Sequence, residues 1–172
     1  MNWLIVVLRL LHIGAGVFWA GAVFTVARFV LPAAAAAGEE GQRFARRLML
    51  QQKLTAAMIG SGVVTVLAGL WLFHIDSGGH EGAFVKSGMG AMLGIGALAA
   101  LSALGTGIRS AVQAATLGKL AAAVEAKGGA PAPEQVRELQ ALGAGLARRA
   151  RSVAIQLGIA VLCMAVARYV VF

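Results

Sequence analysis

The chain has 172 residues and a formal net charge of +8, and 59% of its residues are hydrophobic while only 13% are charged. Soluble domains are about half apolar and a quarter charged, so this composition and the mean hydropathy of +0.81 exclude an ordinary soluble globular protein. The length is that of one domain. We therefore expect a single integral membrane domain that comprises residues 1–172.

Four apolar stretches predict membrane-spanning helices, because each offers about 20 helical residues, enough to cross a hydrocarbon core of about 30 Å. Strands are not expected, since these stretches lack the polar and apolar alternation of barrel strands. The first stretch has no basic segment before it and is too long for the apolar region of a signal peptide, which favours a retained span. The expected spans cover residues 3–31, 54–75, 86–108 and 152–171.

The segment between the third and fourth spans, residues 109–151, predicts a helix, a turn and a second helix. Leucine and valine recur at helical spacing on both sides of the sequence GGAPAP, which favours a turn at 128–133. A loop without helices is the alternative, but the alanine-rich composition argues against it. The expected fold is therefore all-α: a four-transmembrane-helix bundle with spans three and four extended into a cytoplasmic helical hairpin.

The distribution of basic residues predicts the orientation. The two longer connections carry most of the Lys and Arg, whereas the short connection HIDSGGHEGAFVK has Asp76, Glu81 and only Lys86. Lys and Arg accumulate on the cytoplasmic side, so both termini are expected to lie outside a bacterial inner membrane. The basic residues have no stacking aromatics among them, which argues against nucleic acid as a partner and favours anionic lipid headgroups.

Side chains that can bind a metal gather in the half of the predicted bundle that faces outward. His12 lies about nine residues into the first span, and His74 ends the second. A polar residue inside a span costs a few kcal/mol and usually faces the bundle interior or a cavity. A ligand role is therefore the first interpretation of His12, and a packed, hydrogen-bonded histidine is the alternative. Further candidates at a similar depth are Arg9, Met89, Met92, Cys163, Met164 and Arg168.

The string LHIGAGVFWAGAVFTVARF resembles the first span of the HemJ family, membrane proteins with a four-helix core that are linked to protoporphyrinogen oxidation. The shared features are a Leu-His pair ending at His12, Trp19 seven residues later, and Arg28 nine residues after the Trp. Lys86 stands where that family has a lysine at the start of its third span. The CopD-like copper-transport domains are equally similar through His12, Trp19 and Gly21. The resemblance implies haem b for a HemJ-like protein and copper for a CopD-like one.

Local chemistry favours haem b over copper. A haem needs an apolar slot, one or two axial ligands and cations for its propionates. The residues expected at such a site are His12 as axial ligand, His74 or Lys86 as the second, Arg9 and Arg168 at the propionates, and Trp19 of the shared motif. Copper would instead require soft ligands, and the candidates are His12, Met89, Met92 and Met164.

We therefore expect a membrane haem b protein that works in electron transfer or in porphyrin or quinone redox chemistry. If it is an enzyme, the resemblance implies an oxidoreductase. Copper handling is one alternative, and a non-catalytic small subunit of a larger membrane complex is another. The partners left open by the sequence are a redox partner, a larger complex and a second copy of the chain.

Overall fold

The structure is a computed structural model, and it describes residues 2–126 and 132–171. Within these two ranges all regular secondary structure is helical, which confirms the predicted all-α bundle. Four helical segments are long and apolar enough to cross a membrane. The protein therefore has the architecture of an integral membrane protein.

The first span is longer than the predicted 3–31, because three helical segments follow one another without a break. These are α1 (Trp3–Thr25), a π-helical turn η1 (Val26–Val30) and α2 (Leu31–Ala36). Pro32 explains the change of helix type, since it has no N–H to offer the carbonyl four residues earlier. The turn before it is wider: the N–H of Leu31 donates to the carbonyl of Val26, five residues back.

The connection between the first and second spans is itself helical, which the sequence analysis did not predict. It contains α3 (Gly38–Arg46) and a second π-helical turn, η2 (Arg47–Gln51). Gly38 separates α2 from α3 with a φ of 62°, a conformation that glycine adopts readily. Lys53 takes a left-handed φ of 56° and ends this connection before the next span. The chain thus reverses within a short, folded unit.

The other three spans begin and end near their predicted bounds or extend beyond them. They are α4 (Leu54–Asp76), α6 (Gly88–Ala126) and α7 (Pro133–Val166), with the short α5 (Glu81–Phe84) before α6 and the 3-10 turn η3 (Ala167–Tyr169) after α7. Because α6 and α7 continue unbroken beyond their spans, the predicted helical extension of spans three and four is confirmed. The turn predicted at 128–133 lies largely outside the described residues.

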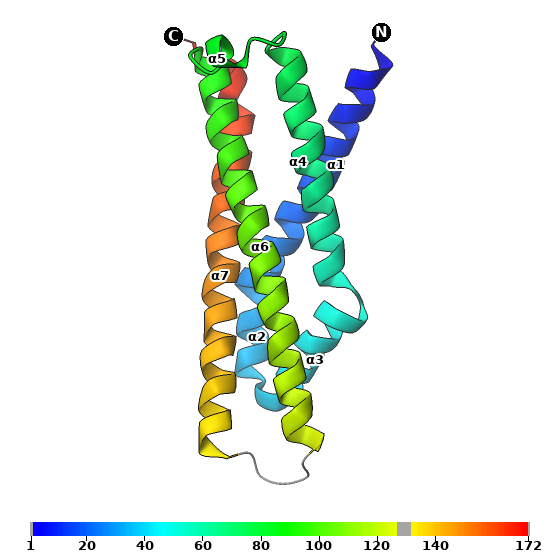
Figure 1. Cartoon of the computed structure of the whole chain (residues 1–172), viewed down its shortest axis with the longest axis vertical. Coiled ribbons are helices and arrows are strands. Elements are labelled where there is room, and N and C mark those ends of the chain that lie inside the picture. The colour runs from blue at the N-terminus through cyan, green and yellow to red at the C-terminus, as the bar shows by residue number, and fades with distance from the viewer. Residues whose placement is uncertain (1, 127–131, 172) are drawn as a thin grey trace.

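The four long helices form two pairs that pack into one bundle. The most extensive contacts are between α6 and α7 and between α1 and α4, while α4 also contacts α6 and α1 contacts α7. Both termini lie at the same end, as four spans require, and the two pairs diverge toward that end (Figure 1). We call it the terminal end and the opposite one the hairpin end.

The core lies where the two pairs meet. Its centre is Trp19, of which only 4% is exposed. A Cβ at Gly62 would lie 2.8 Å from the indole, so only glycine lets the ring rest against the backbone of α4. The other buried members of this cluster are Val23, Ala100, Ala103, Val153, Leu157 and Ala160.

Candidate functional site

A cavity of about 630 Å³ lies between the four long helices toward the terminal end of the bundle. Its volume falls within the range of small-molecule and cofactor sites. Most of its wall is apolar and comes from α1, α4, α6 and α7. The polar or charged residues that line it are Arg9, His12, Thr65, Asp76 and Arg168.

His12 is held in the cavity wall by a contact between α1 and α4. Its Nδ1 lies 2.8 Å from the backbone carbonyl oxygen of Thr65. A carbonyl oxygen can only accept, so Nδ1 carries the hydrogen and donates it. In the neutral imidazole, the lone pair then lies on Nε2.

Gly69 makes that contact possible. In a helix the Thr65 carbonyl points toward the residue four positions later, which here has no side chain. A Cβ at Gly69 would lie 2.7 Å from Cε1 and 2.8 Å from Nδ1 of His12. The glycine therefore leaves both the space for the ring and the open side of the carbonyl oxygen. The hydroxyl of Thr65 is turned away, since it donates to the carbonyl of Ser61 at 2.8 Å.

The second ring nitrogen of His12 remains accessible. Within the described residues, Nε2 makes no hydrogen bond, and the one buried side-chain nitrogen or oxygen there without a partner is Oε1 of Gln156. Nε2 is therefore not sealed inside protein, and the residue lines the cavity. A basic nitrogen with a fixed tautomer is thus available to a bound molecule.

Three charged residues surround the mouth of the cavity. Arg9 lies one turn nearer the terminal end than His12 on α1, Arg168 lies on η3, and Asp76 is the last residue of α4. All three side chains are exposed, and none of them forms an ion pair with another described residue. Arg168 lies with its guanidinium 5.9 Å from the ring centroid of Tyr169. The mouth thus carries two cations and one carboxylate beside an apolar interior.

The cavity brings together some of the sequence-predicted residues and leaves others outside. Those lining it are Arg9, His12, Trp19, Met164 and Arg168, whereas His74, Lys86, Met89, Met92 and Cys163 do not line it. No group of three or more His, Cys, Asp or Glu that could hold a metal ion occurs in the described residues. Sequence reasoning missed Thr65 and Gly69 as the partners of His12. It counted Asp76 only as a loop charge, although its place at the outer end of a span is the same signal that singled out Arg168.

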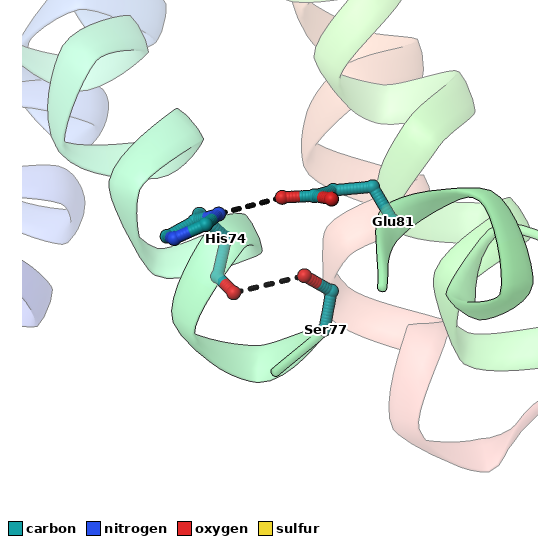
Figure 2. A network of polar contacts seen from close by, with 3 residues as sticks. All are labelled: His74, Ser77 and Glu81. Atoms are coloured by element: carbon teal, nitrogen blue, oxygen red, sulfur yellow. Dashed lines mark hydrogen bonds and ion pairs between the residues drawn. The ribbon is translucent and has the colours of Figure 1, made fainter. Parts of the chain in front are cut away.

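His74 does not line the cavity and takes part in a separate polar network. Its Nδ1 lies 2.6 Å from Oε1 of Glu81, and the hydroxyl of Ser77 donates to the His74 carbonyl at 2.8 Å (Figure 2). The hydrogen bond from His74, with a smaller contribution from a backbone hydrogen bond, lowers the pKa of Glu81 below its ordinary value of 4.5. This pair ties the end of α4 to α5.

Acidification is expected to loosen this tie. Because the pKa of Glu81 is lowered, the pair stabilises the connection fully above the ordinary carboxyl pKa, and this contribution is lost as the pH falls through the lowered value. Hydrogen-exchange protection of residues 77–87 should therefore be retained above the ordinary carboxyl pKa of 4.5 and decrease as the pH falls below it. Glu81→Gln should remove this pH dependence, whereas Glu134→Gln at the hairpin end should retain it. Equal pH dependence in the wild type and Glu81→Gln would contradict the expectation.

These observations define the structural class of the protein. It is a bundle of four apolar helices that encloses an apolar cavity, with charged residues at the mouth of the cavity and one histidine held in the cavity wall. No protein-family model, curated protein or solved structure matches this chain.

Proposed function

We propose that the chain binds haem b in the cavity at the terminal end, with Nε2 of His12 as an axial ligand. The observation that carries this proposal is the hydrogen bond from Nδ1 of His12 to the Thr65 carbonyl. Histidines that bind metals almost always donate their other ring N–H to a carbonyl, a carboxylate or water, which fixes the tautomer and the ring orientation. A histidine that serves packing alone does not need a nitrogen open to a cavity.

The rest of the lining fits the same group. Haem requires an apolar slot and cations for its propionates, and the cavity has apolar walls with Arg9 and Arg168 at its mouth. Arg9 and His12 are three residues apart and share a helix face. Charge-assisted hydrogen bonds to carboxylates are among the strong ones, so each arginine would offset the cost of bringing a propionate to the membrane surface.

Copper is less well supported by the same lining. Cu(I) prefers thiolate and thioether ligands, but among the methionine candidates only Met164 joins His12 at the cavity. Two guanidinium groups at the mouth also disfavour a bound cation. We assign no second axial ligand, because neither His74 nor Lys86 lines the cavity.

The proposed role is electron transfer or porphyrin or quinone redox chemistry, as the resemblance to the HemJ family implies. Haem would supply one-electron redox chemistry in this site. The chain's own residues would position haem and shield it from water: Thr65 would hold His12, and Trp19 and the apolar walls would line the slot. Asp76 adds a carboxylate at the mouth, a type of group that can accept a proton from a bound substrate. A redox partner or a larger membrane complex would complete the reaction.

We infer the orientation from charge. Lys and Arg are concentrated in the connection before α4 and in the hairpin formed by the ends of α6 and α7, and such residues accumulate on the cytoplasmic side. The hairpin end would then face the cytoplasm of a bacterial inner membrane. Both termini and the mouth of the cavity would face outward.

Absorption spectra of the purified protein in mild detergent, oxidised and reduced, test the proposal together with metal analysis. We expect about one b-type haem per chain. Arg9→Leu should weaken haem retention or shift the midpoint potential without preventing membrane insertion. Arg28→Leu is the matched control, because Arg28 lies on the same helical span but at its other end. This variant should leave both haem retention and the midpoint potential unchanged. Copper without haem would overturn the proposal, and a protein without any cofactor would favour a non-catalytic subunit.

A further inference from the structure

A second cavity, of about 420 Å³, lies nearer the hairpin end than the first, between the π-helical turn η1 and α7. We call it the basic groove. Its charged residues are Arg28 and Arg151, and its apolar residues include Phe24, Pro32 and Ile155. Arg28 belongs to the motif shared with the HemJ family, yet it has no part in the proposed haem site. The basic groove therefore requires its own explanation.

Within the part of the chain that the structure describes, no carboxylate neutralises the two arginines. Both side chains are exposed, and neither forms an ion pair with a carboxylate among the described residues. No acidic residue lines the basic groove. Glu39, on the nearby α3, is paired with Arg43 instead. Two positive charges thus face one apolar groove without a counter-ion from the described residues.

Helix geometry places these charges at the membrane surface. Arg9 and Arg28 are 19 residues apart on one span, and Arg151 on the antiparallel α7 and Arg168 on the following turn η3 are 17 apart. At 1.5 Å per residue these separations are about 28 Å and about 26 Å, close to the hydrocarbon thickness of about 30 Å. The two arginine pairs therefore mark the two headgroup levels.

The apolar part of the basic groove lies on the hydrocarbon side of its charges. Phe24 is one turn nearer the membrane centre than Arg28, and Ile155 is one turn nearer than Arg151. The groove thus has a cationic end at headgroup level and an apolar end within the acyl-chain region. This order matches that of a phospholipid, from its phosphate to its chains.

We propose that the basic groove binds one anionic phospholipid, with its phosphate held by Arg28 and Arg151 and an acyl chain lying along Phe24 and Ile155. Guanidinium groups match the geometry of phosphate oxygens. Basic pockets between membrane helices are a recurrent site for anionic headgroups. The site is independent of the haem proposal, since the two cavities share no lining residue.

The full chain, stripped of lipid in detergent, can be titrated with phosphatidylglycerol, phosphatidylcholine or inorganic phosphate. Native mass spectrometry counts bound lipid, and thermal unfolding reports its stabilising effect. We expect saturable binding of one phosphatidylglycerol per chain, at least tenfold tighter than that of phosphatidylcholine. The double variant Arg28→Gln, Arg151→Gln should lose this preference. Arg109→Gln, an exposed arginine of α6 outside the basic groove, is the matched control and should keep it.

A second variant keeps the test decisive if loss of both arginines impairs folding. Ile155→Trp fills the apolar part while retaining both charges, and it should weaken phosphatidylglycerol binding at least tenfold. Equal binding of both lipids would overturn the proposal. So would stabilisation by inorganic phosphate alone, unchanged binding in Ile155→Trp, or a lipid-free dimer in which a second copy covers the groove.

Discussion

Replacement of His12 by alanine is expected to lower the haem content of the purified protein at least tenfold while membrane insertion is unaffected. The variant removes the proposed iron ligand and leaves the apolar walls and the arginines in place. Insertion should be maintained because the substitution removes a polar group from a span. Haem per chain, measured from the absorption spectrum of equal amounts of protein, checks the prediction.

His74→Ala is the matched control for this experiment. It removes the same side chain from the end of α4 that lies at the terminal end of the bundle, where the ring is hydrogen-bonded to Glu81 and does not line the cavity. We expect its haem content and spectrum to match those of the wild type. Full haem content in His12→Ala would show that this residue is not the essential ligand. A changed spin state in His74→Ala would instead assign His74 as a second ligand.

Gly69→Ala is expected to reduce haem retention nearly as much as loss of the histidine itself. The added methyl group would lie 2.7 Å from Cε1 and 2.8 Å from Nδ1 of His12, distances that real Cβ atoms do not tolerate. The ring must therefore move, and the hydrogen bond to the Thr65 carbonyl is lost with it. Without that bond the tautomer and orientation of the ligand are no longer fixed, a loss that typically costs about 10-fold to 100-fold in metal affinity.

Gly60→Ala provides the comparison on the same helix. A Cβ there meets nothing within 4 Å, and alanine is favoured over glycine in a helix by about 0.5–1 kcal/mol. We expect unchanged haem content and equal or greater thermal stability. If Gly69→Ala and Gly60→Ala retained haem equally, the contact between His12 and α4 would not govern the site.

The positions of the spans could be predicted because hydropathy and length are local properties of the sequence. The π-helical turn before Pro32 and the helices of the first connection could not, since a proline predicts a disturbance without specifying which helical form absorbs it. The burial of Trp19 was predictable from its depth in a span. Its contact with Gly62 was not, because the register between α1 and α4 is set by packing.

Only part of the candidate site could be predicted, because the sequence does not specify the direction of a side chain. Counting residues from a membrane surface gives the depth of a side chain but not the direction in which it points. Arg9, His12 and Arg168 shared both depth and direction, so they meet at one cavity. His74 shared only depth, and the direction of its ring is set by Glu81 across a turn. The position of His12 against Thr65 and Gly69 depends on a contact between residues more than fifty positions apart in the sequence. A local sequence pattern cannot predict such a contact.

The unbroken helices of the hairpin have a mechanical consequence. At 1.5 Å per residue, the 39 residues of α6 extend for about 58 Å, roughly twice the hydrocarbon thickness. The same helix provides Leu93 and Ala97 to the wall of the cavity. Because neither helix is interrupted between its apolar span and the hairpin, we expect α6 and α7 to move as rigid rods without a hinge. A force applied to the hairpin end of these helices is therefore expected to tilt the part of α6 that lines the cavity.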